Sequence, residues 1–227
     1  IALDLREQAA AAKETPLQLQ EQDRLILSVK ATDQYDLGGE SHIGSSESVT
    51  LTVVRPDELL AILDGRELGL RRRLDQIRGE MGQSRDQLGR LRGSFRDARD
   101  DEETANLQEL RDRWASWASQ KGDQSSLEIE GLALAFEDIR EELINNRLDT
   151  QPRKSRLEIE IIAPLRKIAG DMFPAWQRTL GLLRSELPRD EKAAESLAVK
   201  AVNEADQILV SIDDVLSKML ELEDYAE

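Results

Sequence analysis

One heptad stripe of apolar residues constrains the fold of this chain more than any other feature of its sequence. Alternating steps of three and four residues from Leu60 meet apolar side chains at all but two positions, Glu67 and Ser84; the stripe is Leu60, Leu63, Glu67, Leu70, Leu74, Ile77, Met81, Ser84, Leu88, Leu91, Phe95 and Ala98. Such a stripe is typical of a long helix that buries one narrow side against other helices. It predicts helix packing and says nothing of an activity.

Three further stripes follow. The second helix is predicted from about Glu102 to Asn146, with the stripe Leu107, Leu110, Trp114, Ala118, Gly122, Ser125, Ile129, Leu132, Phe136, Ile139 and Leu143. The third, to about Leu187, buries Ile162, Leu165, Ala169, Met172, Trp176, Leu180 and Leu183. The fourth carries Ala194, Ala198, Ala201, Ala205, Ile208, Ile212, Val215, Met219 and Leu222. Helices of matched length with short turns predict an elongated antiparallel bundle of four long helices, running up-down-up-down.

Several residues predict irregularities in these helices. The first helix should open at Pro56 and end near Arg99, with Gly93 as an alternative end. The step through Trp114 is a stutter in the heptad, and Gly122 predicts a kink or a full break in the second helix. Pro164 and Pro174 predict bends in the third helix because each proline removes a helical hydrogen bond.

Composition excludes several functional classes. The 227 residues carry 46 acidic and 31 basic side chains, a formal charge of −15, which argues against nucleic-acid binding. There is no cysteine, so disulfides and thiolate metal sites are excluded. No apolar run is long enough to span a bilayer, and no signal peptide is visible. The chain opens at Ile1 without a methionine, and we expect it to be a piece of a longer protein.

Residues 1–55 show a different period. Apolar residues alternate with polar ones from Leu25 to Ala31 and again from Val49 to Val53, which predicts two strands with one covered face each. The glycine-rich segment Asp33–Ser46 reads as a hairpin loop, and a short strand is expected at residues 17–19. Two or three strands need packing partners in the helices, in another chain or in residues outside this sequence.

The stretch from Leu19 to Leu60 also resembles a known arrangement. Asp23-Arg24-Leu25, Val29-Lys30-Ala31-Thr32-Asp33 and Val49-x-Leu51-x-Val53-Val54 resemble the last two strands of an immunoglobulin- or cadherin-like sandwich. The following Arg55-Pro56-Asp57-Glu58-Leu59-Leu60 resembles a group of large, uncharacterised, membrane-anchored bacterial cell-envelope proteins, in which such strands lead into long helices. The resemblance implies an extracytoplasmic location and a structural or interaction role, and it brings no catalytic residues.

Each candidate site residue has a structural interpretation that is simpler than a role in a binding or catalytic site. His42, the only histidine, and the acidic residues Asp33, Asp36 and Glu40 lie in the predicted loop, where solvated polar residues are common, although a calcium site is an alternative. Trp114 and Trp176 are expected in the core and Trp117 at its boundary, the alternative being a ligand pocket. Arg71, Arg72 and Arg73 favour a salt-bridged face over a membrane-binding patch. Glu67 and Ser84 interrupt the first stripe; a polar residue there can fix helix register or pair with an arginine across the bundle, and we favour register over the alternative of a polar site.

The predicted organisation is therefore a partial β subdomain over residues 1–55 and a helical bundle over residues 56–227. We expect a structural or protein-interaction module of a larger cell-envelope protein rather than an enzyme, with no catalytic, cofactor or metal site. Its partner would be another protein, or a second copy bound through helical faces, for which Leu59, Ile62 and Leu182 are candidates. The alternative is a sensor or ligand-binding bundle with a cavity near Gly122 or the two prolines.

Overall fold

The computed structural model describes residues 19–32, 43–96 and 101–220, with the backbone alone at residues 101–105 and 220. It is a mainly α protein with four long helices and a small antiparallel β element before them, as predicted. The chain divides into two compact units, Ile1–Ile62 and Leu63–Glu227, so the division falls inside the first long helix rather than at its start. Within the described residues, no helix is both long and apolar enough to cross a membrane.

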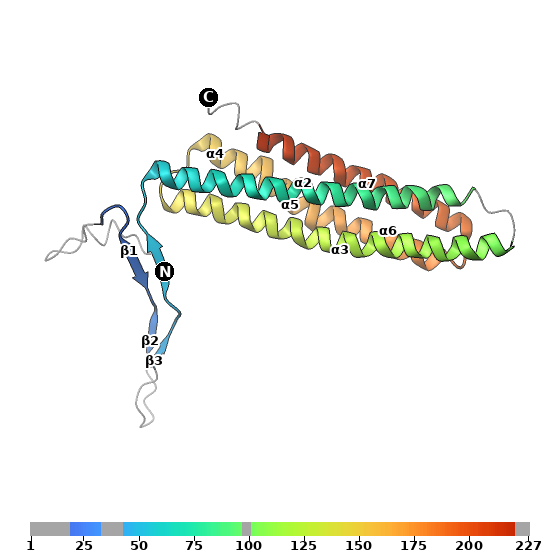
Figure 1. Cartoon of the computed structure of the whole chain (residues 1–227), viewed down its shortest axis with the longest axis horizontal. Coiled ribbons are helices and arrows are strands. Elements are labelled where there is room, and N and C mark those ends of the chain that lie inside the picture. The colour runs from blue at the N-terminus through green and yellow to red at the C-terminus, as the bar shows by residue number, and fades with distance from the viewer. Residues whose placement is uncertain (1–18, 33–42, 97–100, 221–227) are drawn as a thin grey trace, which may run out of the picture. The chain divides into compact units, whose positions relative to one another are not determined.

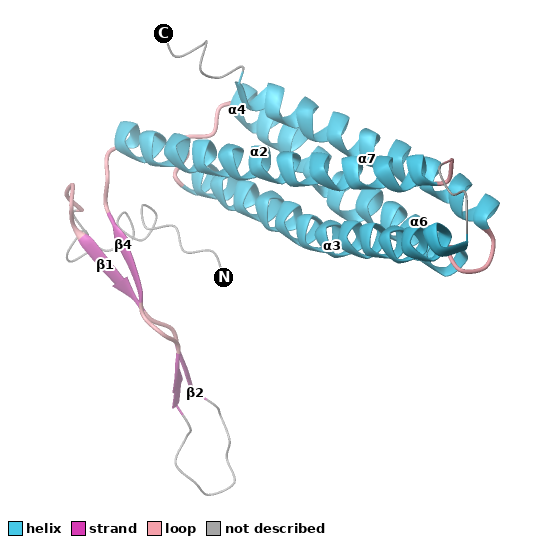
Figure 2. Ribbon diagram, turned by 45° about the vertical axis from the view of Figure 1, so that its right-hand side comes forward, coloured by secondary structure: helices cyan, strands magenta, loops and turns pink. Residues whose placement is uncertain are grey.

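The β element of the first unit is a two-stranded ribbon with an interruption. Strand β1 (Arg24–Leu27) pairs antiparallel with β4 (Val49–Thr52), and β2 (Lys30–Thr32) pairs with β3 (Ile43–Ser45). The strands are shown in Figure 2. The predicted loop is therefore shorter than expected, because its last residues form β3.

A bulge separates the two halves of the ribbon. Two residues, 28 and 29, lie opposite three, 46 to 48, because Leu27 pairs with Val49 while Lys30 pairs with Ser45. The hydroxyl of Ser46 accepts the N–H of Val29 at 2.9 Å, and the N–H of Ser46 donates to the carbonyl of Val29 at 2.8 Å. The extra residue changes which side chains share a face on either side of the bulge.

The second unit is an antiparallel four-helix bundle (Figure 1). Its helices are α2 (Pro56–Ser94), α3 (Asp101–Asn145), a third helix over residues 151–186, and α7 (Glu191–Leu220). The third helix comprises α4 (Gln151–Ser155), η1 (Arg156–Ile162), α5 (Ala163–Lys167), η2 (Ile168–Met172) and α6 (Phe173–Glu186). The start at Pro56 and the bounds of α3 are confirmed to within a residue, while α2 ends beside Gly93, the alternative end.

The alanine-rich half of α7 packs most closely. Every described position of its predicted stripe is buried, from Ala194 to Met219. Small side chains let helix axes approach, and the backbones of α6 and α7 are nearer to each other than α2 is to either of its neighbours. The interface of α2 is instead built from larger side chains, among them Leu74, Ile77 and Met81, all fully buried.

Ion pairs flank α2 on both sides. Arg66 pairs with Glu142 and Arg73 with Glu128 on α3, in the reversed order that an antiparallel pair requires. On the other side, Arg78 pairs with Asp213 of α7; the hydrogen bond and charge of Asp213 raise the pKa of this arginine. Exposed pairs of this kind contribute little to stability individually. Their long side chains can nevertheless span the wider separation between α2 and its neighbouring helices.

Helix α3 corrects two predictions. It runs unbroken through Gly122, so the predicted break is wrong. Near its start the buried positions are Arg111, Ala115 and Ala118, whereas Trp114 is only half-buried. These residues continue the regular heptad of Gly122 and Ser125, so the stutter predicted at Trp114 is wrong as well. The error arose because a buried arginine does not look like a core residue in sequence.

The third helix passes both prolines by π turns. The N–H of Ala163 donates to the carbonyl of Glu158, and that of Phe173 to the carbonyl of Ile168, each five residues back and each just before a proline. The wider turn fits the proline ring, which would otherwise crowd the turn before it. Each extra residue also shifts the phase of the helix. Ile168 and Phe173 are therefore in the core, while Ala169 and Met172, predicted there, are half-buried.

Candidate functional site

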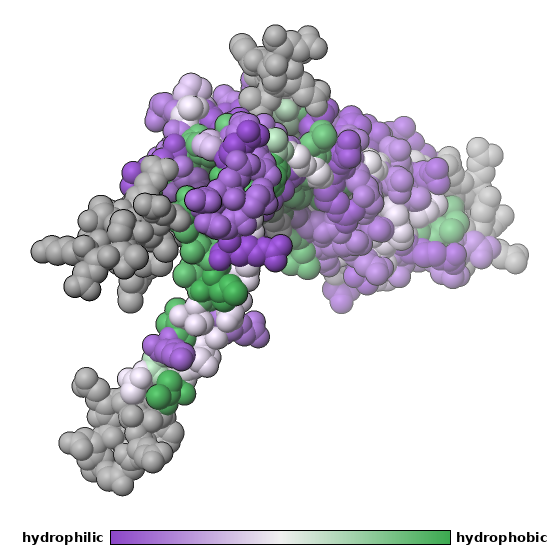
Figure 3. Space-filling model, turned by 60° about the vertical axis from the view of Figure 1, so that its left-hand side comes forward, coloured by the Kyte–Doolittle hydropathy of each residue, from purple (hydrophilic) through white to green (hydrophobic). Residues whose placement is uncertain are grey.

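One face of the β ribbon is apolar and open. Leu25 pairs with Leu51 and Leu27 with Val49, and residues paired directly across antiparallel strands project to the same side. The predicted covered face is not found among the described residues: Val49 is 57 % exposed and Leu51 41 %, and every residue of β2, β3 and β4 is exposed. Apolar side chains are visible along the ribbon surface in Figure 3. The four aliphatic side chains on the two strands form a partly exposed apolar surface, in which Val49 and Leu51 are exposed and Leu25 and Leu27 half-buried.

The backbone of the ribbon is open at its edges too. Val53 bonds toward β1 through both of its groups: its N–H donates to the carbonyl of Asp23, and its carbonyl accepts the N–H of Gln22, each at 2.8 Å. Backbone direction alternates along a strand, so Thr52 and Thr50 direct their N–H and carbonyl groups to the outer edge. No further described strand pairs with β4 on that side. This edge can accept another strand.

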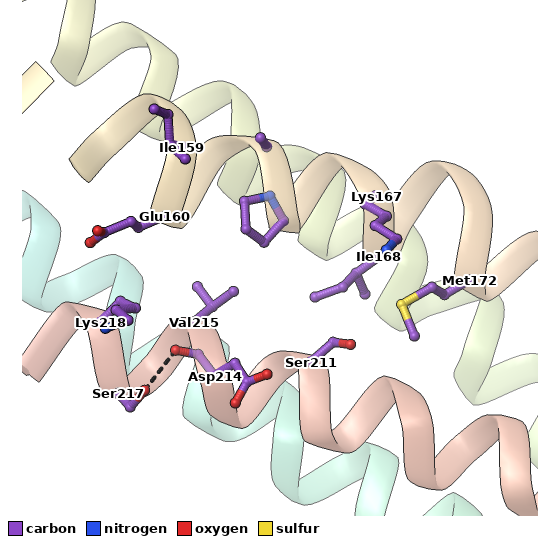
Figure 4. Close-up of a pocket in the computed structure, with 12 residues that line it drawn as sticks. Ile159, Glu160, Lys167, Ile168, Met172, Ser211, Asp214, Val215, Ser217 and Lys218 are labelled. Atoms are coloured by element: carbon purple, nitrogen blue, oxygen red, sulfur yellow. Dashed lines mark hydrogen bonds between the residues drawn. The ribbon is translucent and has the colours of Figure 1, made fainter. Parts of the chain in front are cut away.

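The bundle offers a second candidate, a groove of ≈ 550 Å³ between the third helix and α7. Figure 4 shows Ile168 and Val215 pointing into it from opposite helices. Its lining comprises Ile159, Glu160, Ala163, Pro164, Lys167, Ile168, Met172, Ser211, Asp214, Val215, Ser217 and Lys218. The groove adjoins Pro164, one of the places where the sequence predicted an opening.

The π turns explain why the groove forms here. The turn at Ile168–Met172 moves Phe173 into the core and leaves Met172 at the margin, beside the groove. Opposite these residues, α7 presents Ser211 and Ser217 together with Asp214, Val215 and Lys218. The groove therefore lies beside both π turns, where the third helix departs from the regular heptad.

The chemistry of the groove favours binding over catalysis. Its floor is apolar, and its margins carry Glu160, Lys167, Asp214 and Lys218. The hydroxyl of Ser217 donates to the backbone carbonyl of Asp214 at 2.8 Å, which is an ordinary helical hydrogen bond and does not activate a nucleophile. Mixed charges around an apolar floor suit an amphipathic ligand.

The predicted loop residues His42, Asp33, Asp36 and Glu40 lie outside the described residues. Within the described part of the chain, no three acidic or histidine side chains gather as a metal ion requires. Leu59 is buried, whereas Ile62 and Leu182 are exposed on different helices, so these three do not form one stripe.

The tryptophans are distributed differently from the prediction. Trp176 is fully buried, donates its indole N–H to the carbonyl of Ala201 at 2.9 Å, and meets Phe173 edge-on with ring centres 6.1 Å apart. Gly122 faces this indole: a Cβ placed there would lie 2.5 Å from a ring carbon of Trp176. Gly122 is therefore a packing residue that makes room for Trp176. Trp114, predicted in the core, is half-buried, as is Trp117, predicted at the boundary.

Sequence reasoning missed Arg111, the most connected polar residue of the bundle. It is 2 % exposed; its Nε donates to the hydroxyl of Ser94 at 2.9 Å and one terminal nitrogen to the carbonyl of Ser94 at 2.8 Å. The other terminal nitrogen pairs with Glu191 at 3.0 Å, and the guanidinium lies over the ring of Phe95. Arg111 of α3 thus joins the end of α2 to the start of α7. Regular heptad steps counted back from Gly122 through Ala118 and Ala115 reach Arg111, so the spacing could have identified this residue as buried.

Of the two polar interruptions of the first stripe, Glu67 has the predicted arginine partner, while the role of Ser84 in helix register stays a prediction. Glu67 pairs with Arg156 across the bundle at 2.7 Å, with both side chains largely buried. Ser84 is buried and donates to the carbonyl of Glu80 in its own helix. In the arginine run, Arg73 pairs with Glu128 of α3, as a salt-bridged face requires.

The chain was compared with protein-family models, with curated proteins and with solved structures, and none of the three comparisons found a match. The functional argument therefore depends on the geometry of the ribbon and the groove.

Proposed function

We propose that the chain is a non-enzymatic protein-interaction module whose binding surface is the β ribbon. The observation that carries the proposal is the shared apolar face of Leu25, Leu27, Val49 and Leu51, on which Val49 and Leu51 are exposed. A two-stranded ribbon is marginal in water on its own, and stability requires further strands or a packing surface. Full burial of an aliphatic side chain stabilises by about 1.5–3 kcal/mol. A protein strand that pairs at the edge of the ribbon, or a surface that packs on this face, supplies what the ribbon lacks.

The bundle fits a supporting role. Its heptad stripes are buried along α2 and α7, and its buried polar residues Arg111 and Glu67 have partners within the bundle. A bundle with long buried stripes is suited to act as a spacer. The resemblance of the ribbon and the start of α2 to cell-envelope proteins supports placing this module outside the cytoplasm, as part of a membrane-anchored parent.

Hydrogen exchange followed by mass spectrometry tests the role of the ribbon. At a concentration where sedimentation shows a monomer, amides of β1 and β4 should exchange within seconds, while those of α7 in the same sample stay protected for hours. Protection of the ribbon amides in the monomer would contradict the proposal, because the chain would then already cover the surface itself.

The groove beside Pro164 favours a second function, a ligand-binding bundle. Its volume of ≈ 550 Å³ lies in the range of small-molecule sites. The dye 1-anilinonaphthalene-8-sulfonate, an apolar anion, is a suitable probe. Ala163→Arg, which fills the groove, should abolish dye binding, whereas Ser185→Arg at an exposed position of α6 should leave it unchanged. Equal dye binding by the two variants would remove the groove as a ligand site.

A further inference from the structure

Strand β4 and its next residue are symmetric in sequence. Val49-Thr50-Leu51-Thr52-Val53 reads the same in both directions about Leu51. If two such strands run antiparallel about this residue, Val49 lies opposite Val53, Thr50 opposite Thr52, and Leu51 opposite its own copy. All apolar side chains then share one face and all threonines the other. A twofold axis through Leu51 therefore makes this edge complementary to itself.

The backbone polarity of the same edge agrees with this arrangement. Thr50 and Thr52 direct their N–H and carbonyl groups outward, as the bonds of Val53 to β1 show. In the symmetric pair, Thr50 of each copy would exchange two hydrogen bonds with Thr52 of the other. Four intermolecular hydrogen bonds form, and no bond within either ribbon is lost.

The pairing also extends the apolar face. Leu25, Leu27, Val49 and Leu51 share one face of each ribbon. Joining the ribbons at β4 gives a sheet in the order β1-β4-β4-β1, with these residues of both copies side by side. Three or more strands with a common apolar face are the usual minimum for a stable sheet, and one ribbon has only two strands.

Charge at the two ends of the match is complementary. Glu47 and Arg55 lie at equal distances in sequence from Leu51, on opposite sides, and both are exposed. By sequence spacing, the twofold axis would bring Arg55 of one copy toward Glu47 of the other at each end, although Arg55 already pairs with Glu21 and Asp57 of its own chain and Glu47 lies in the bulge. Strand β1 has no such symmetry: its outward-facing residues are Arg24 and Ile26, which differ in size and charge.

We propose that two copies of this chain associate through the outer edge of β4, in antiparallel register about Leu51. The proposal rests on the proposed function of the ribbon and names its partner. It uses the ribbon edge rather than the helical faces from which the sequence predicted self-association.

Sedimentation of paired proline variants tests the edge. Thr50→Pro removes an outward N–H and should weaken self-association of the full chain at least tenfold. Ile26→Pro is the matched control, because Ile26 lies directly opposite Thr50 and directs its own N–H to the other edge. It should leave self-association unchanged. A dimer equally sensitive to both variants, or insensitive to Thr50→Pro, would overturn the proposal.

A single cysteine tests the register, since the natural chain has none. The central pair has no hydrogen bond between its residues, and Cα atoms in such pairs are ~4.5 Å apart, within disulfide reach. Leu51→Cys should therefore yield a disulfide-linked dimer under mild oxidation, whereas Leu25→Cys, on the same face but on β1, the outer strand of the joined sheet, should cross-link far more slowly. Equal cross-linking of the two variants would refute the register.

The two proposals fail in different ways. A monomer at all concentrations whose ribbon amides exchange rapidly would refute pairing between copies and leave the ribbon as a surface for a different protein. Ribbon amides protected in the monomer would refute both.

Discussion

Alanine at Gly122 should destabilise the bundle, although glycine is a poor helix former. In an exposed helix interior, Gly→Ala stabilises by up to about 1 kcal/mol. At Gly122 the new Cβ would lie 2.5 Å from a ring carbon of Trp176 and 2.5 Å from the side-chain nitrogen of Gln177. Both atoms must therefore move.

The indole has little freedom to move. Trp176 is fully buried, and its N–H is held by the carbonyl of Ala201 at 2.9 Å. Overpacking of a filled core costs about 1–3 kcal/mol, and a displaced indole also weakens a buried hydrogen bond, worth about 1 kcal/mol. After subtracting the helical gain, we expect Gly122→Ala to lower the free energy of unfolding by about 1–3 kcal/mol.

The control is Gly131→Ala in the same helix, where nothing lies within 4 Å of the added Cβ. This substitution should raise the stability, so the two variants should differ in sign. Urea unfolding followed by circular dichroism measures both. A Gly122→Ala variant as stable as Gly131→Ala would refute the packing of Gly122 against Trp176. Trp176→Phe removes the clashing ring atoms, so the double variant with Gly122→Ala should lose less than the sum of the single losses.

Three further predictions concern the polar contacts of the bundle. Arg111→Met should lower the free energy of unfolding by about 2–4 kcal/mol, because it leaves the buried carbonyl and hydroxyl of Ser94 without their donor; a loss as small as that of Arg113→Met, at an exposed position of the same helix, would contradict this. Glu67→Leu should cost about 3–5 kcal/mol by leaving Arg156 buried without its charge partner, and adding Arg156→Leu should recover part of the loss in the same urea titration. Arg78→Gln and Arg85→Gln should barely move the midpoint of thermal unfolding, because their pairs with Asp213 and Asp206 are exposed and screened by salt. Hydrogen bonds to acidic partners raise the pKa of both arginines, so both stay charged through the neutral range. A loss of thermal stability in either variant that changed with pH near 7 would contradict this.

The heptad predicts a helix well where the buried side chains are apolar and the helix is regular. The stripes of α2 and α7 are confirmed from Leu63 to Leu91 and from Ala194 to Met219. In α3 the prediction fails near Trp114, since a search for apolar residues passes over Arg111. That residue is buried because Ser94 and Glu191 supply its hydrogen bonds, and both lie on other helices. Such partners become visible only when distant segments are placed together.

The third helix shows a different limit. Pro164 and Pro174 predicted a disturbance, but not its form, because a proline can be accommodated by a bend, a break or a wider turn. The π turns keep the helix continuous and change its phase, so a stripe counted in constant steps misses at Ala169 and Met172, in the second π turn, and agrees again from Trp176 to Leu183. Met172 is the result: it was predicted in the core and lies beside the groove.

These failures of the heptad coincide with the two candidate binding surfaces. The groove lies beside the two π turns of the third helix, where the regular heptad is interrupted. The ribbon lies before the first heptad begins, and its alternating pattern predicted a covered face that the described residues do not provide. The apolar side chains of a regular heptad stripe are buried by the stripes of the neighbouring helices. The ribbon belongs to no such stripe, and the symmetry of Val49–Val53 about Leu51 is the basis for proposing that its open edge pairs with a second copy of the same strand.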